Sequence, residues 1–169
     1  IYEKDTYKDK RGYFRELFIL KHFNENFPFD VMSYSKKNVL RGLHLQLKNP
    51  QAKLVTVLKG KIFDVCLDCR KQSKTFGKYY SIFLSDVENK SILIPKGFAH
   101  GFITLEDSTE VIYKVSNYYA PDFDFGIKWN DPEINIDWGV NNADVIISEK
   151  DQNQPYLNEI DTPFVYGEN

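Results

Sequence analysis

Short runs of apolar, strand-forming residues, separated by Gly, Pro, Asn and Asp, recur about every ten residues from Val31 onward. Such a series is typical of antiparallel sandwiches and barrels. The predicted strands are residues 53–58, 61–67, 79–84, 91–94, 101–105 and 110–116. No apolar run of helical period is long enough to cover a parallel sheet. The pattern therefore predicts an all-β fold, an antiparallel sandwich or barrel with short peripheral helices.

Two of these runs are separated only by Lys59-Gly60. This spacing predicts a β-hairpin between residues 53–58 and 61–67. The side chains expected on one face of the second strand are Phe63, Val65 and Leu67.

The N-terminal region has a different pattern. Residues 1–20 are predicted to form an extended arm, with a turn at residues 9–12 and a strand over residues 13–18. Residues 21–30 could form one short helix that the proline within them ends. His22 would then lie on the surface.

Composition limits the number of domains, the kinds of partner and the cellular compartment. The chain has 169 residues, 42% of them hydrophobic, which predicts a single domain over residues 1–169 with one substantial core. Its 22 basic and 24 acidic residues give a net charge of −2, with no basic block, which argues against nucleic-acid or membrane partners. No membrane span or signal peptide is visible. Cys66 and Cys69 lack a second pair that would complete a zinc site, so we interpret them as unpaired thiols of a cytoplasmic protein.

Candidate chemistry is concentrated in residues 39–46 and at Lys53. Arg41, His44 and Lys53 supply a base and positive charge, which proton removal beside a carbonyl requires. On a regular strand Arg41 and His44 would face opposite sides, so a bulge or bend is needed to bring both to one pocket. A strand with a solvated arginine and a core histidine would give the same pattern, and spacing alone leaves both interpretations open.

A second histidine, His100, ends a Pro-x-Gly-x-x-His turn that leads into a strand. This turn, with His44 on an earlier strand, resembles the two signature regions of the cupin jelly roll. Metal-binding cupins carry His-x-His and a downstream Glu in the first region, but here the second position is Gln46 and no Glu follows at the usual distance. Because catalytic metal sites keep three protein ligands, we predict neither a metal nor another cofactor. Tyr113 is a plausible acid, although a tyrosine in a β-rich chain usually serves packing.

An ordered set of motifs resembles the nucleoside-diphosphate-4-keto-6-deoxysugar 3,5-epimerase family. The motifs are Arg11-Gly12-Tyr13-Phe14-Arg15-Glu16, Ser33-x-Ser35, Val39-Leu40-Arg41-Gly42-Leu43-His44-x-Gln46, Gln51-x-Lys53-Leu54-Val55, Phe63-Asp64-Val65-x-x-Asp68-x-Arg70, Ser73-x-Thr75-Phe76-Gly77, Ile94-Pro95-x-Gly97-Phe98-Ala99-His100-Gly101-Phe102, Tyr113-Lys114, Tyr118-Tyr119-x-Pro121 and Trp129-Asn130-Asp131-Pro132. Each motif is weak alone, but the ordered set is highly specific. The resemblance implies a cupin-type jelly roll, a homodimer and a nucleotide-sugar substrate.

The resemblance also implies roles for matching residues. His44 would be the base that removes the proton next to the C4 ketone, and Asp151 would pair with it. Lys53 would stabilise the enolate oxygen, and Tyr113 would deliver a proton from the opposite face. The implied substrate-binding positions are Arg11, Arg41 and His100 for the diphosphate or sugar, Phe14, Glu16 and Tyr119 around the base, some of them across a dimer interface, and also Ser33 and Gln46.

The chain departs from the family pattern at Phe29 and Val31, where relatives commonly carry two substrate-facing amides in Gln-x-Asn-x-Ser-x-Ser. This change bears on the nucleotide or sugar more than on the chemistry. We expect a cofactor-free epimerase whose default substrate is dTDP-4-keto-6-deoxyglucose, inverted at C3 and C5. Inversion at C3 alone and a different nucleotide sugar stay open. The rival from another class is a sugar-binding cupin without catalysis, and Gln46 disfavours a metal-dependent oxygenase.

Overall fold

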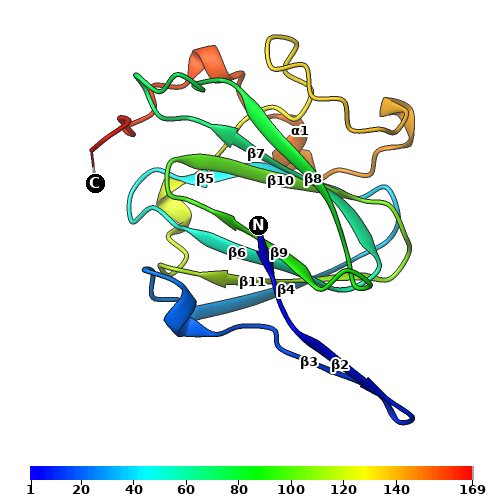
Figure 1. Ribbon diagram of the computed structural model, residues 1–169. Helices are drawn as coiled ribbons and strands as arrows, with labels where there is room; N and C mark the ends of the chain where they lie inside the picture. Colours follow the sequence, from blue (N-terminus) through cyan, green and yellow to red (C-terminus); the bar gives the residue numbers. More distant parts are fainter. Residues whose placement is uncertain (169) are drawn as a thin grey trace.

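The computed structural model describes residues 1–168 and contains two five-stranded antiparallel sheets that face each other (Figure 1). The first sheet has the order β1 (Tyr2–Glu3), β9 (Lys90–Ile94), β6 (Lys53–Lys59), β11 (Thr109–Val115) and β4 (Phe29–Ser35). The second has the order β12 (Asp124–Gly126), β5 (Leu40–Gln46), β10 (Phe98–Thr104), β7 (Lys61–Asp68) and β8 (Tyr79–Ser85). A separate ribbon consists of β2 (Thr6–Asp9) and β3 (Gly12–Arg15). The helical segments are α1 (Glu149–Gln152) and the 3₁₀ turns Leu20–His22, Pro121–Phe123, Asn142–Asp144 and Leu157–Glu159.

This architecture confirms the predicted all-β class with short peripheral helices. The last residue of the predicted domain over residues 1–169 lies outside the described part. Within residues 1–168, every helix is too short or too polar to cross a membrane.

The link at Lys59-Gly60 corrects the predicted hairpin. β6 pairs with β9 and β11 in the first sheet, whereas β7 pairs with β8 and β10 in the second. The chain therefore crosses between the sheets at Gly60, which has a φ of 82°. A Cβ there would lie 2.5 Å from Thr109 Oγ1, so the corner requires glycine. The prediction was wrong because a corner between sheets and a hairpin use the same short, glycine-containing link.

The N-terminal region is also less regular than predicted. β3 ends at Arg15 rather than at Phe18, and the helical structure that follows is limited to the turn Leu20–His22. The rings of Phe18, Phe23 and Phe27 pack with centroids 5.5 to 5.7 Å apart. Phe27 is buried, and the Lys114 ammonium of β11 lies 4.6 Å from the centroid of the Phe18 ring, so this aromatic packing outweighs local helix preference.

Two hydrophobic clusters lie on the two faces of the second sheet. The cluster between the sheets takes side chains from β6, β9 and β11 on one side and from β7, β8 and β10 on the other. On the outer face of the second sheet Phe63, Val65 and Leu67 lie together, as predicted, under a C-terminal segment that includes Trp129 and Trp138. The central strands of the second sheet are therefore buried on both faces, which explains their long apolar runs.

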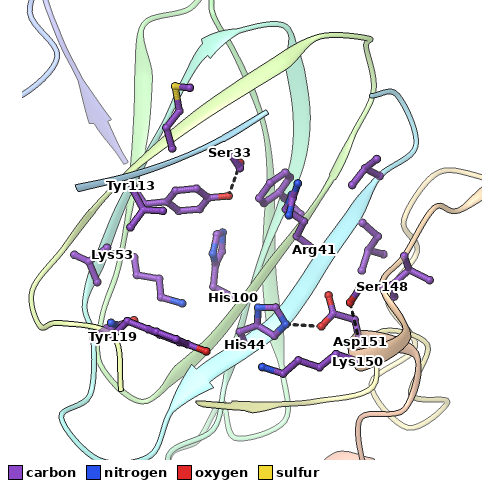
Figure 2. Close-up of a pocket in the computed structure, with 18 of the residues that line it drawn as sticks. Ser33, Arg41, His44, Lys53, His100, Tyr113, Tyr119, Ser148, Lys150 and Asp151 are labelled. Carbon is purple, nitrogen blue, oxygen red and sulfur yellow. Dashed lines mark hydrogen bonds and ion pairs between the residues drawn. The ribbon is translucent and has the colours of Figure 1, made fainter. Parts of the chain in front are cut away.

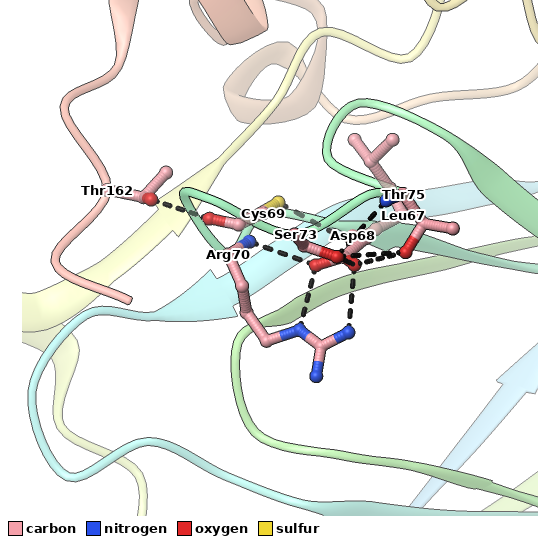
Figure 3. A network of polar contacts seen from close by, with 7 residues as sticks. All are labelled: Leu67, Asp68, Cys69, Arg70, Ser73, Thr75 and Thr162. Carbon is pink, nitrogen blue, oxygen red and sulfur yellow. Dashed lines mark hydrogen bonds and ion pairs between the residues drawn. The ribbon is translucent and has the colours of Figure 1, made fainter. Parts of the chain in front are cut away.

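A buried carboxylate fixes the turn after β7 (Figure 3). Asp68 accepts hydrogen bonds from Arg70 Nε at 2.9 Å and from Ser73 Oγ and Thr75 Oγ1 at 2.7 Å each. Burial alone would raise the pKa of Asp68, but these donors hold it well below its usual value. The motif Asp68-x-Arg70 thus stabilises the turn after β7.

The two cysteines are free and buried, which confirms that they are unpaired. Burial raises the pKa of the Cys66 thiol and of the Cys69 thiol to about 12. Neither is therefore an ionised, reactive thiolate at neutral pH.

Candidate active site

A cavity of about 810 Å³ is lined by β4, β5, β6, β10 and β11 and by the segment that leads into α1 (Figure 2). Eight of the residues predicted for the site line it, namely Ser33, Arg41, His44, Lys53, His100, Tyr113, Tyr119 and Asp151. Residues that lie more than a hundred positions apart in the sequence meet here. The cavity is therefore the candidate active site.

Arg41 and His44 reach the same cavity because the pairing of β5 with β10 is irregular. His44 lies opposite His100, and the register shifts by one residue before Arg41. Gly42 and Gly101 meet at the shift, where a Cβ on Gly42 would lie 2.4 Å from the Gly101 Cα. The bulge that the sequence required is thus present, and it depends on two glycines that let the strands approach closely.

His44 is paired with a carboxylate from the far end of the chain. His44 Nε2 lies 2.7 Å from Asp151 Oδ1, and the Gly42 N–H donates to Asp151 Oδ2 at 3.3 Å. Asp151 lies in α1, and its N–H donates to the Oγ of Ser148, the N-cap residue. Burial alone would raise the pKa of Asp151, but the hydrogen bonds from His44 and Gly42 lower it. The charged Asp151 orients the imidazole, while the opposite ring edge faces the cavity (Figure 2).

The second cavity histidine has a carboxylate partner of its own. His100 Nε2 lies 2.8 Å from Asp64 Oδ2, and both side chains are buried. The other oxygen of Asp64 is buried and has no hydrogen-bond partner within residues 1–168. The His100 ring meets the Tyr113 ring edge to face, with centroids 6.2 Å apart. His100 is therefore a fixed part of the cavity wall.

Tyr113 and Lys53 extend from the first sheet and face His44 across the cavity (Figure 2). The Tyr113 and Ser33 hydroxyls are 3.1 Å apart. Burial raises the pKa of Tyr113, although the bond with Ser33 acts in the opposite direction, so the phenol carries its proton at neutral pH. Burial lowers the pKa of Lys53, against the attraction of Asp124 and Asp64.

Tyr119 shares a carboxylate with a lysine that the sequence analysis missed. The Tyr119 hydroxyl donates to Asp124 Oδ2 at 3.0 Å, and Lys150 Nζ lies 2.6 Å from the same oxygen. Lys150 lines the cavity, but no sequence signal predicted the short helix that brings it there. Gln51 was also missed, although its spacing from Lys53 places both on one face of a strand and could have revealed it.

Three predicted residues lie away from this cavity. Arg11 and Phe14 belong to the β2–β3 ribbon, which projects from the two sheets, and Glu16 follows it directly (Figure 1). Arg11 forms an ion pair with Asp9 at 2.6 Å, and Phe14 is 72% exposed beside Tyr7. The structure therefore does not bring these three residues to His44 of the same chain.

Gln46 is the fourth predicted residue that does not line the cavity. Its side chain is buried, and its Nε2 donates to the carbonyl oxygens of Asn49 at 2.6 Å and Tyr118 at 3.3 Å. Its Oε1 accepts from the Ala120 N–H at 2.9 Å. The amide thus connects the loops after β5 and β11, and its predicted contact with substrate stays a prediction.

Metal ligands do not gather in the described part of the chain. Within residues 1–168, no group of three His, Cys, Asp or Glu side chains is placed to hold a metal ion. Each cavity histidine directs its Nε2 to a carboxylate. The donor set therefore suits two separate histidine–carboxylate pairs.

A proton acceptor, a proton donor and a cation surround the cavity. His44 can accept a proton on one side, Tyr113 can donate one on the other, and the ammonium of Lys53 can stabilise a developing oxyanion. This arrangement suits removal of a proton next to a carbonyl and its return to the opposite face of the same carbon.

Comparison with known proteins identifies relatives over most of the chain. Residues 1–159 match the family described as dTDP-4-dehydrorhamnose 3,5-epimerase. The protein of that name from Methanothermobacter thermautotrophicus is 48% identical over 165 residues, which cover 94% of this chain and 89% of the relative. That from Shigella flexneri is 44% identical over 160 residues, with coverage of 90% and 87%.

Solved structures agree with this assignment. The crystal structure of dTDP-6-deoxy-D-glucose-3,5-epimerase from Legionella pneumophila, in complex with dTDP-4-keto-L-rhamnose, has a TM-score of 0.92 and 41% identity and covers 96% of this chain and 90% of its own. A 3'-monoepimerase from Streptomyces bikiniensis, in complex with dTDP-quinovose, has a TM-score of 0.86 and 27% identity, with coverage of 93% and 82%. The predicted cupin-type fold and family are confirmed, and the chain belongs to the dTDP-4-dehydrorhamnose 3,5-epimerase family of isomerases.

Proposed function

We propose that the chain inverts C3 and C5 of dTDP-4-keto-6-deoxyglucose, with His44 as the base and Tyr113 as the acid. The proposal rests on the opposition of these two side chains across one cavity, with Lys53 on the same sheet as Tyr113 (Figure 2). A base and an acid on opposite faces are what inversion at a carbon requires. The ketone makes the neighbouring C–H bonds acidic, so the reaction needs no cofactor.

Each inversion would proceed through an enolate. The ring nitrogen of His44 that is not paired with Asp151, Nδ1, takes the proton from the carbon next to the ketone. The C–H electron pair forms a C=C bond, and the carbonyl π pair moves to the oxygen, which the Lys53 ammonium stabilises. As the ketone re-forms, the carbon takes the Tyr113 hydroxyl proton on its other face. Solvent then returns a proton to the phenolate and removes one from the imidazolium.

The nucleotide part of the substrate is inferred from relatives and from charge. The Legionella structure contains dTDP-4-keto-L-rhamnose, and one from Bacillus anthracis contains TDP and pyrophosphate. Arg41 and Lys150 give this cavity cationic groups that suit a diphosphate.

The decisive experiment is incubation with dTDP-4-keto-6-deoxyglucose in deuterium oxide, followed by NMR location of the label. Deuterium at both C3 and C5 is expected. Label at C3 alone would make the chain a 3-epimerase, as the Streptomyces bikiniensis relative is described. Binding without label at either carbon would favour the sugar-binding alternative.

The substrate site would be completed by a second copy of the chain. The β2–β3 ribbon exposes Tyr7, Tyr13 and Phe14, and an isolated two-stranded ribbon is barely stable in water. We propose a homodimer in which this ribbon packs on the partner. Mixing a His44→Ala chain with a Phe14→Ala chain should restore activity that neither has alone, because one site of the heterodimer keeps both groups. Monomeric protein with full activity would contradict the dimer.

A further inference from the structure

One of the apolar walls of the cavity is supplied by β4 and lies on the side of Tyr113. Phe29 and Val31 both line the cavity, and Val115 lies beside them on β11. The ring of Phe29 packs against that of Tyr118, with centroids 5.9 Å apart. The nearest polar side chain of β4 that lines the cavity, Ser33, is paired with the Tyr113 hydroxyl. Substrate groups that meet this wall therefore find hydrocarbon.

Strand register places the wall beside the reacting groups. Val31 lies directly opposite Tyr113, and Phe29 lies opposite Val115, which in turn lies opposite Lys53. Residues paired in this way have Cβ atoms about 5 Å apart on one face of the sheet. The apolar wall is therefore next to Tyr113, the proposed acid. It also lies in the same cross-strand row as Lys53, the cation proposed to stabilise the ketone oxygen.

A 4-keto-6-deoxy sugar carries one apolar substituent near its ketone, the methyl group on C5. When C5 is the reacting carbon, this methyl lies one bond from the carbon that Tyr113 serves and two from the carbonyl carbon. When C3 is the reacting carbon, a hydroxyl occupies the corresponding place. An apolar wall stabilises the first arrangement and leaves the hydroxyl of the second without a partner.

We propose that Phe29 and Val31 bind the C5 methyl group and so favour reaction at C5, selecting 6-deoxy over 6-hydroxy 4-keto sugars. This inference rests on the proposed epimerase function and assigns specificity to two residues of the same site. One methyl group in a fitted apolar pocket changes kcat/KM by about 10-fold or more.

The test follows deuterium exchange at C3 and C5 separately in native protein and in the variant Phe29→Tyr/Val31→Thr, which adds a hydroxyl to each side chain of the wall with little change of shape. Exchange at C5 should fall about 10-fold in the variant, with a smaller change at C3. Binding of dTDP alone, measured by calorimetry, should not change. The control is Val87→Thr, the change made at Val31 applied to a side chain that is 88% exposed between β8 and β9.

A second arm uses native protein and so does not depend on whether the variant folds. The analogue with a hydroxymethyl group at C5 should exchange at C5 about 10-fold more slowly than the 6-deoxy substrate. Equal C5 exchange of the two substrates, equal losses at C3 and C5 in the variant, or weaker binding of dTDP alone would each overturn the inference while leaving the epimerase function in place. Absence of exchange in native protein with either substrate would instead remove the proposed function itself.

Discussion

The cavity contains two histidine–carboxylate pairs of nearly equal length in very different surroundings. His44 lies 2.7 Å from Asp151, and His100 lies 2.8 Å from Asp64. The side chain of His44 is 30% exposed, whereas that of His100 is 4% exposed and that of Asp64 is fully buried. Pair geometry alone therefore does not identify a base. The exposure of the ring does, because a base must exchange protons with substrate and solvent.

The origin of the carboxylates reinforces the difference. Asp64 comes from β7, which pairs with the strand of His100, so this pair belongs to the sheet itself. Asp151 comes from α1 and is also held by the N–H of Gly42. The buried pair is expected to act mainly on stability, and the open pair mainly on catalysis.

The largest expected effect is on catalysis through the open pair. His44→Ala should lower alpha-deuterium exchange by about 10²–10⁴-fold, because it removes the general base. Its free energy of unfolding should fall by no more than about 1 kcal/mol, since the ring is partly exposed and Asp151 keeps the Gly42 hydrogen bond. Exchange kinetics and urea unfolding measure the two effects. A folded variant with near-native exchange would refute the assignment of His44.

Loss of the buried pair should affect stability more than catalysis. His100→Ala leaves the carboxylate of Asp64 buried without its partner, and the free energy of unfolding should fall by about 3–5 kcal/mol. Urea denaturation at pH 7 gives the value. A change as small as that of His44→Ala would show that the two pairs do not differ as their burial indicates.

Replacing Lys53, the cation that faces His44 and Asp151, is expected to raise the free energy of unfolding, and by a smaller amount. Burial holds its pKa below the unfolded value of about 10.4, so keeping the ammonium charged in the fold costs free energy. The cost is complete below the folded pKa and disappears as pH rises to the unfolded one. Lys53→Met should therefore stabilise the protein by about 1 kcal/mol at pH 7, lose this advantage near pH 10.5, and abolish exchange. Lower stability than native protein at pH 7 would contradict this sign.

Chelation should have no effect. His44 and His100 lie opposite each other on β5 and β10, so a metal bound by both rings would link the two histidine–carboxylate pairs. Each Nε2 is already directed to a carboxylate, and we expect exhaustive chelation to leave exchange unchanged. Loss of exchange that a single metal restores would show that the two histidines act together.

The local pattern of apolar and polar residues predicted where the strands lie, but it predicted poorly which strands pair. The predicted run 110–116 became β11 (Thr109–Val115), and the apolar face of β7 was assigned correctly. Strand alternation is a local property, so sequence reveals it. The hairpin at Lys59-Gly60 failed because the hydrogen-bond partner of a strand depends on distant strands that compete for the same edges.

For the site as well, the sequence predicted which residues are present but not where each side chain points. Sequence pointed to His44, Lys53 and Tyr113, and the structure places all three around one cavity. Gln46 matched a motif but turned its amide to loop carbonyls, and Lys150 was missed because the helix that carries it has only four residues. A motif specifies residue type and order, whereas cavity lining depends on where each side chain points.

The sequence by itself determined the β-strand series, the family, and the kinds of side chain available for proton transfer. The resemblance also predicted the pairing of Asp151 with His44, which the structure contains. Only the tertiary structure decided that Asp64 pairs with His100, and that Phe29 and Val31 form an apolar wall beside Tyr113. The reason is physical. Strand formation follows from neighbours along the chain, but burial, pKa and pairing of a charged group depend on the low-dielectric surroundings that segments from both ends of the chain create together.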